Sequence, residues 1–338
     1  MRFRTEYKPA KAPFIMDPGR PVVLLGSCFA DNIGKRMRAS LWKAYNPLSV
    51  LYNPLSIERS LKVALSEDGD MADFNSSLFE KDGIVRSWLF DSKLSSECRE
   101  DTLAGFCRRR DVVCDLLRRA QGLFVTFGTS YVYELSERPG YVVSNCHKQP
   151  SDMFVRRRLG VVEIVDAWEA LAKSLRERFP GLDIVFTVSP VRHLKDGFVG
   201  NARSKAVLLL AVEELCDRLE YCHYFPAYEI VNDDLRDYRF YASDLVHPSD
   251  DAVEYIWEAF KSTFLGSRGE EMLKEGERIV KGWLHRRLPD STRQPSEASQ
   301  EKWHEWRRSV ERRYEAFADA YGEVLPLDYP FQSDPGFM

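Results

Sequence analysis

The chain has 338 residues, of which 44% are hydrophobic and 12% aromatic, and 48 Lys and Arg against 52 Asp and Glu give a formal net charge of −4. This composition is typical of a globular protein with a large core in one to three domains. The balanced charge disfavours nucleic-acid binding and attachment to an anionic membrane. We interpret the arginine runs at 107–113 and 154–159 as solvated faces.

The first residues and the cysteines bear on the cellular compartment. Residues 1–20 lack the apolar run of a signal peptide, and no stretch approaches the ~20 apolar residues of a membrane span. The seven cysteines are scattered without a C-x-x-C pair, which disfavours a disulfide framework and a zinc site. No phosphate-binding glycine motif occurs. We expect a soluble cytoplasmic protein without a metal or cofactor.

Four apolar runs are predicted to be strands: VVLL (22–25), LFVTF (123–127), DIVFTV (183–188) and YCHYF (221–225). Amphipathic segments at 161–179 and 202–219 have helical spacing. Strands that alternate with helices predict a parallel sheet covered on both faces, which is a three-layer α/β/α sandwich. Ligands bind such sheets at the carboxyl ends of the strands, where Ser27, Gly128 and Ser189 are expected.

A segment in the first third of the chain interrupts this alternation. Residues 74–97 contain LFEKDGIVRSWLF, in which two apolar runs flank Asp82-Gly83. An Asp-Gly pair between such runs is typical of a tight hairpin turn. We therefore predict a β-hairpin insertion that lies over one edge of the active face.

The last quarter of the chain is charged and helical. Residues 288–299 resemble a linker, and residues 301–321 predict a helix with an aromatic stripe. We expect a core domain over 1–265 and a helical C-terminal extension over 266–338. The stripe packs against the body of the protein or against a second copy in a homo-oligomer.

The turn after the first strand contains a candidate nucleophile, Ser27. An apolar residue recurs every four positions behind it, at Phe29, Ile33, Met37 and Leu41. This spacing predicts a helix whose first turn begins at the serine. Free N–H groups at a helix N-terminus stabilise a developing oxyanion, which suits a nucleophile. Serines that only cap a helix occupy the same position.

A second candidate is the Asp-x-x-His pair Asp244 and His247, just before a helix predicted to start near Pro248. A serine nucleophile needs a general base, and the base needs a partner that orients its ring. Alone, the pair also fits a capping aspartate and a surface histidine. Together with a serine after the first strand, it favours a Ser-His-Asp arrangement.

These positions resemble the SGNH/GDSL hydrolases, and Gly26-Ser27-Cys28-Phe29-Ala30 resembles the signature of the GSCFA family in that clan. Further similar segments are NPLSVLYNPLSI (46–57), TFGTSYVYE (126–134), NCHKQP (145–150), SPVRHLKDG (189–197) and RFYASDLVHPS (239–249). The similarity covers about residues 20–260. It implies an SGNH-type sandwich and a serine hydrolase in which Ser27 attacks, His247 is the base and Asp244 orients the base.

The resemblance also implies an oxyanion hole with a glycine N–H after strand two and an asparagine in a G-x-N-D segment. The chain departs from both, with Ser49 in place of the glycine and no asparagine in Gly128-Thr129-Ser130. The candidate donors are therefore Cys28, Ser49, Gly128, Ser130 and Asn145.

Several neighbours compete for a role at the site. A thiolate of Cys28 at the helix N-terminus is a second candidate nucleophile, although adjacent residues on a turn diverge. His147 and His193 lie in loops expected to open onto the active face, where a histidine is otherwise a surface or capping residue. With Arg192 and Asn201, they are the expected substrate-binding residues.

The expected reaction is ester hydrolysis or deacylation through an acyl-serine intermediate. Analogy with the clan implies a small-molecule or carbohydrate ester, an acylated carbohydrate above all, as substrate. The alternative is a non-catalytic acyl- or carbohydrate-binding module on the same fold.

Overall fold

The computed structural model describes residues 4–66, 71–285, 297–322 and 324–327. Its centre is a five-stranded sheet in the order β10-β9-β5-β1-β2, in which every neighbouring pair is parallel. The strands are β1 (Val22–Gly26), β2 (Ala44–Tyr45), β5 (Gly122–Phe127), β9 (Asp183–Val188) and β10 (Cys222–Tyr224). All four predicted strands are confirmed. The fifth strand, β2, has two residues and is too short for a periodic signal.

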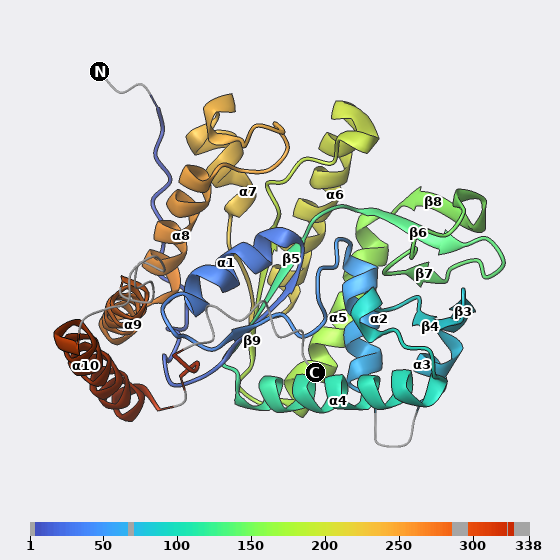
Figure 1. Cartoon of the computed structure of the whole chain (residues 1–338). Coiled ribbons are helices and arrows are strands. Elements are labelled where there is room, and N and C mark those ends of the chain that lie inside the picture. The colour runs from blue at the N-terminus through green and yellow to red at the C-terminus, as the bar shows by residue number, and fades with distance from the viewer. Residues whose placement is uncertain (1–3, 67–70, 286–296, 323, 328–338) are drawn as a thin grey trace.

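Helices cover both faces of this sheet (Figure 1). One face packs against α2 (Pro54–Ala64), α4 (Arg99–Arg119), α5 (Val161–Arg178) and α6 (Gly197–Arg218). The other face packs against α1 (Cys28–Arg38) and α8 (Asp250–Phe264). Along β1, Val23 and Leu25 join the first cluster, whereas Val22 and Leu24 join the second. This alternation follows from the two-residue period of a strand. The predicted α/β sandwich with a parallel central sheet is therefore confirmed.

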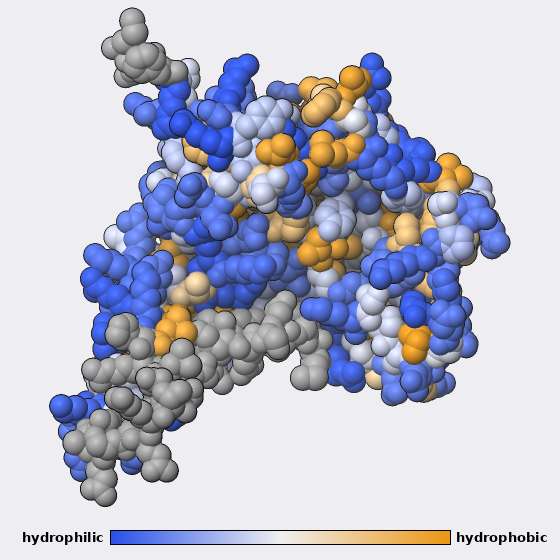
Figure 2. Space-filling model, turned by 45° about the horizontal axis from the view of Figure 1, so that its top comes forward, coloured by the Kyte–Doolittle hydropathy of each residue, from blue (hydrophilic) through white to orange (hydrophobic). Residues whose placement is uncertain are grey.

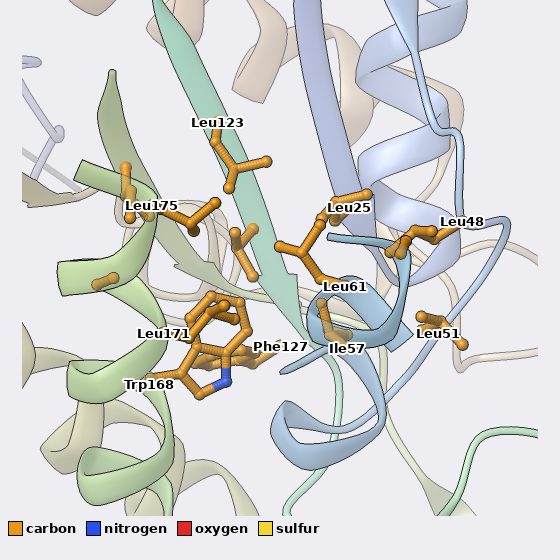
Figure 3. Close-up of a cluster of buried hydrophobic side chains, with 14 of the residues drawn as sticks. Leu25, Leu48, Leu51, Ile57, Leu61, Leu123, Phe127, Trp168, Leu171 and Leu175 are labelled. Atoms are coloured by element: carbon orange, nitrogen blue, oxygen red, sulfur yellow. The ribbon is translucent and has the colours of Figure 1, made fainter. Parts of the chain in front are cut away.

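The first core cluster packs α2 and α5 against β1 and β5 of the sheet (Figure 3). Phe127 of β5 contacts Trp168 of α5 edge-on, with ring centroids 5.3 Å apart. The Trp168 indole N–H donates to the carbonyl of Pro54 at the start of α2 over 3.0 Å. Trp168 is fully buried, and truncation of such a side chain costs ~3–5 kcal/mol of unfolding free energy. Trp168 therefore links the end of β5 to the start of α2.

Two smaller antiparallel sheets flank the main one. The predicted hairpin is confirmed as β3 (Leu78–Lys81) and β4 (Ile84–Ser87), and Asp82 and Gly83 adopt φ of 52° and 70° as a tight primed turn requires. The sequence did not predict the other sheet, β7 (Val142–Val143), β6 (Tyr131–Leu135) and β8 (Phe154–Arg158). The β8 segment lies within the arginine run at 154–159; none of its residues is fully buried, and Arg156 and Arg157 form ion pairs.

The C-terminal helices α9 (Ser267–His285) and α10 (Glu297–Tyr321) pack beside each other on the α1 and α8 side (Figure 1). Met272 of α9 and Phe317 of α10 belong to the second core cluster. The predicted helix at 301–321 is confirmed with an earlier start. Most of the predicted linker at 288–299 lies outside the described residues. Among the described residues, no helix has both the length and the apolarity to cross a bilayer.

Short elements complete the described chain. They are α3 (Ala72–Ser76), α7 (Ala227–Glu229) and the single turns Ser92–Leu94, Ser151–Met153, Leu194–Asp196, Ile230–Leu235 and Tyr238–Phe240. The turn Leu194–Asp196 leads from β9 toward α6, and Tyr238–Phe240 precedes the Asp244–His247 loop. Both therefore lie in the loops that surround the carboxyl edge of the sheet.

Candidate active site

A pocket of about 510 Å³ lies at the carboxyl edge of the parallel sheet. Its walls include Ser27 after β1, Thr129 after β5 and His193 after β9. If the five strands are numbered one to five along the chain, their order across the sheet is two-one-three-four-five. The direction of winding therefore reverses between β1 and β5. Ligands bind open parallel sheets at such a switch point. This edge points to the top of Figure 1 and comes forward in Figure 2, where hydrophobic patches are scattered among hydrophilic side chains.

The turn before α1 requires a glycine. Gly26 has φ of 119°, and a Cβ on it would lie 2.1 Å from the carbonyl oxygen of Thr126 on the neighbouring strand. The Gly26 carbonyl accepts the amide of Leu51 over 2.9 Å. The backbone of this turn is therefore fixed by contacts with the chain on both sides of β1.

Ser27 occupies the N-cap position of α1 but does not cap the helix with its side chain. The residue is 1% exposed, and Oγ has no hydrogen-bond partner among the described residues. A buried hydroxyl without a partner is costly in a structural role. Because Ser27 also lines the pocket, the capping interpretation does not account for it, whereas a group held ready for a ligand does.

Asp244 and His247 form a tight pair on the loop before α8. Oδ2 of Asp244 lies 2.7 Å from Nδ1 of His247, and Oδ1 accepts the amides of His247 and Val246 over 3.0 and 2.9 Å. The His247 amide, the His247 ring and the Val246 amide hold the pKa of Asp244 down at about 2. A carboxylate at Nδ1 fixes the tautomer that presents Nε2 as the proton acceptor.

The loop that carries this pair is tied to the loop after β9. The Arg192 amide donates to the carbonyl of Val246 over 3.2 Å, and the Ala242 amide donates to that of His247 over 2.8 Å. The side chain of Ser249 caps α8 by accepting the amide of Ala252. Capping is therefore the role of Ser249 and not of Asp244.

Ser27 and His247 line the same pocket but do not form a hydrogen bond in this structure. Catalytic hydrogen bonds in ligand-free enzymes are often long and tighten when substrate binds. The pocket therefore brings together Ser27 and His247, the candidate nucleophile and base, and Asp244 contacts His247 from outside its lining.

Cys28 is less suited than its neighbour to be the nucleophile. Burial raises the pKa of the Cys28 thiol and outweighs the amides of Cys28 and Phe29, which lower it. A thiol of this kind stays protonated near neutral pH and attacks poorly. Its backbone N–H, at the first position of α1, has no carbonyl of the helix to bind.

Three of the five candidate oxyanion donors already have partners. The Gly128 amide donates to the carbonyl of Tyr52 over 2.8 Å, and the Ser130 amide donates to Oγ of Ser204 over 2.8 Å. Ser49, which has φ of 63°, directs its amide to the carbonyl three residues earlier at 3.4 Å. Neither Ser49 nor Ser130 lines the pocket.

Asn145 is the remaining side-chain candidate and lines the pocket. Its Oδ1 accepts the backbone amide of His147 over 2.7 Å, and the backbone N–H of Asn145 donates to the carbonyl of Trp88. These bonds fix the side chain so that Nδ2 is the group available for a ligand. The Cys28 amide and Asn145 are therefore the two candidates whose surroundings fit an oxyanion.

The region that builds this site, residues 21–260, matches the family model described as the GSCFA family. The match spans well over half of the chain. The chain belongs to the GSCFA family. No curated protein matches the sequence. The matched region of this GSCFA protein contains the whole parallel sheet and both Ser27 and the Asp244–His247 loop, and it ends within α8, before α9 and α10.

The two loop histidines of the GSCFA protein have different surroundings. His193 lines the pocket, packs edge-on against Tyr52 with centroids 6.3 Å apart, and is held through its amide by Asn201. Burial, with the nearby charge of Lys205, lowers the pKa of His193 to about 4. Asn201 itself does not line the pocket, so it supports the His193 backbone.

His147 points to the hairpin region instead. Its Nε2 lies 2.8 Å from the carbonyl of Ser87 and its Nδ1 lies 3.3 Å from Oγ of Ser92. Its ring contacts Phe79 and Trp88. The residue does not line the pocket, and its ring contacts the hairpin at Ser87 and Phe79.

Lys205, which the sequence did not single out, supports the site from outside the pocket lining. It is 1% exposed on α6, and Nζ donates to the carbonyls of Gly128 and Ser189 over 2.6 Å each. Burial lowers the pKa of Lys205 to about 7. The lysine joins the ends of β5 and β9 directly behind the pocket. Its position on the buried stripe with Leu208 and Leu215 was the signal that could have revealed it.

The sheet β7-β6-β8 adds a wall that the sequence also did not predict. Tyr131, Tyr133 and Arg156 line the pocket from this sheet. Arg156 pairs with Asp196 and lies over the Tyr131 ring, with Cζ 4.2 Å from the centroid. An isolated arginine run contains no information on these distant partners.

Among the described residues, no group of three His, Cys, Asp or Glu side chains could hold a metal ion.

Proposed function

We propose that this GSCFA protein is a serine hydrolase that cleaves esters through an acyl-serine intermediate. The observation that carries the proposal is the buried, unpartnered Oγ of Ser27 on the same pocket as His247, which Asp244 orients through a 2.7 Å contact. A reactive serine needs these groups, and a capping serine with a surface histidine does not.

The mechanism follows from the roles of the three residues. Oγ of Ser27 attacks the ester carbonyl carbon while its proton passes to Nε2 of His247. The tetrahedral intermediate then breaks its bond to the alkoxy oxygen, which takes the proton from His247 and leaves as the alcohol. Water attacks the acyl-serine with His247 again as base, which releases the acid and restores Ser27. Asp244 remains a carboxylate and stabilises the imidazolium in both halves of the reaction.

The oxyanion is assigned to the backbone N–H of Cys28 and the side chain of Asn145. The Cys28 N–H suits this role because the N-terminus of α1 carries partial positive charge. Asn145 suits it because Oδ1 is already bonded and Nδ2 remains available for a ligand. The bonded amides of Gly128 and Ser130 argue against either as donor.

The strand order and the places of Ser27 and the Asp-x-x-His pair support an SGNH-type fold. By analogy with that clan, the substrate is an ester of a small molecule or an acylated carbohydrate. All seven cysteines are free thiols, which supports a reducing, cytoplasmic compartment.

A second candidate function is a non-catalytic module that binds acyl groups or carbohydrates. The missing Ser27–His247 hydrogen bond favours the binding module, because a pocket that only binds a ligand does not require contact between a serine and a base. A fluorophosphonate probe with peptide mapping distinguishes the two functions. Labelling of Ser27 in the wild type and none in Ser27→Ala supports the hydrolase. A wild-type protein that binds acetylated sugars but is not labelled at Ser27 is a binding module.

A further inference from the structure

The pocket that contains Ser27 and His247 has an excess of positive charge. Three cationic side chains line it, Arg156, Arg192 and Lys195, together with a single carboxylate, Asp196. The whole chain has a formal net charge of −4, so the excess is local. Clefts with charge of one sign attract ligands of the other sign.

The pocket carboxylate is already used by one of the cations. Asp196 has a side chain that is 1% exposed, and it pairs with Arg156. Arg192 and Lys195 therefore face the cavity without a carboxylate from the pocket wall. Among the ion pairs between described residues, neither Arg192 nor Lys195 takes part.

Aromatic rings hold these cations in place. The guanidinium of Arg192 lies over the rings of Tyr241 and Tyr238, with Cζ 4.0 and 5.0 Å from the centroids. Nζ of Lys195 donates to the hydroxyl of Tyr133. A guanidinium stacked on rings keeps its N–H groups in a fixed plane, which suits two hydrogen bonds to a carboxylate or phosphate.

We propose that the substrate of this site is an anionic ester, whose carboxylate or phosphate binds Arg192 and Lys195 while its ester carbonyl reaches Ser27. The inference rests on the proposed hydrolase function and adds the chemical class of the substrate. It explains why Arg192 and Lys195, which have no ion-pair partner in the pocket wall, line the same cavity as Ser27. Arg156, neutralised by Asp196, supports the wall.

The test compares matched esters that differ in one charge. In the first pair, 4-acetoxybenzoate carries a carboxylate on the alcohol part, and its methyl ester does not. In the second pair, mono-4-nitrophenyl glutarate carries a carboxylate on the acyl part, and 4-nitrophenyl pentanoate does not. After division by the uncatalysed rates, kcat/KM of the anion should exceed that of its neutral partner at least about tenfold in one pair. The ratio should fall with added salt.

Variants connect the preference to the two side chains. Arg192→Gln and Lys195→Gln should each reduce the ratio of anionic to neutral kcat/KM, and the double variant should bring it near one. Arg203→Gln is the matched control, because Arg203 is exposed on α6 and does not line the pocket. Equal kcat/KM within both pairs in the wild type, or the same loss of ratio in Arg203→Gln, would overturn the inference.

A binding measurement separates this inference from the hydrolase proposal. Calorimetry on Ser27→Ala measures the dissociation constants of both members of each pair without turnover. Tighter binding of the anion by about tenfold supports the preference of the pocket for anions, even if the wild type hydrolyses none of the esters. That second result would count against the hydrolase and not against the anion site. Equal binding, or none for either member, overturns the inference. Hydrolysis of neutral esters would then still support the hydrolase.

Discussion

The Ser27 turn and the Asp244–His247 loop form the two halves of the candidate triad, and their surroundings differ. Ser27 is 1% exposed and follows a central strand, whereas the side chains of Asp244 and His247 are each 49% exposed. The close approach of Gly26 to Thr126 fixes the first half, and a few loop hydrogen bonds hold the second. The sheet therefore determines where Ser27, the candidate nucleophile, lies, and the loop determines whether His247, the candidate base, reaches it.

The largest expected effect tests the buried half. Ser27→Ala should lower ester hydrolysis on the order of 10⁴-fold or more and remove fluorophosphonate labelling, because no other group supplies the attacking oxygen. The fold should persist, which circular dichroism and thermal unfolding check. The matched control is Cys28→Ser, which should keep a substantial share of the activity. An active Ser27→Ala together with an inactive Cys28→Ser would exchange the roles of the two neighbours.

The exposed half should give a large but smaller loss. His247→Ala should lower kcat by about 10²- to 10⁴-fold, the usual contribution of a positioned base. Asp244→Asn should lower kcat severely by favouring the wrong tautomer, with little change in stability because the loop is exposed. Since the two residues act as a unit, the losses should not multiply in the double variant. The measurement is kcat for the wild type, the two single variants and the double variant. If the loss in the double variant equals the product of the single losses, Asp244 and His247 do not act as a unit.

The pH profile sharpens the same comparison. Between pH 5 and 9, kcat/KM should rise with pH if a histidine is the base, because only a neutral imidazole can accept the proton of a serine. Asp244, with a pKa of about 2, is ionised throughout, and His193, with a pKa of about 4, is neutral throughout. His193→Gln should therefore keep the shape of the profile. A flat wild-type profile would be incompatible with a histidine base.

Lys205 connects the sheet to the pocket and gives a moderate effect on stability. Its folded-state pKa of about 7 lies below the usual lysine value of 10.5, so the unfolded chain binds more protons between these values. Its contribution to the free energy of unfolding should thus rise from pH 7 upward, by no more than about 1.4 kcal/mol per pH unit. Urea unfolding of wild type and Lys205→Met at pH 7, 8 and 9 measures the difference. A difference that does not change with pH would mean that Lys205 is charged in the folded protein at all three.

The loop histidines should give the smallest effects. His193→Ala should raise KM several-fold, because the ring lines the pocket but transfers no proton. His147→Ala should leave kcat and KM within about twofold, since its ring contacts Ser87, Phe79 and Trp88 instead. Steady-state kinetics on the same ester decide both. A loss from either variant as deep as that of His247→Ala would move the base to that histidine.

Patterns with a short period were sufficient to predict the framework of the protein. The strands at 22–25 and 183–188 and the helix at 161–179 lie where the apolar spacing indicates, within one residue at most of their bounds. The hairpin turn at Asp82-Gly83 also follows from local backbone preferences. Each of these features depends on neighbours a few positions away, so the sequence contains the whole signal.

Only the tertiary structure decided how the site is completed. It placed His193 on the pocket and His147 on the hairpin, although both occupy similar loops. It also joined Arg156 to Asp196 and buried Lys205 against the carbonyl of Gly128, pairs that are 40 and 77 residues apart. By itself, the sequence determined four strands of the sheet, the serine after the first of them and the Asp-x-x-His pair, because local periodicity and turn chemistry encode them. Which amides are bonded and which cations face the cavity depends on packing between distant segments, and no local pattern records that.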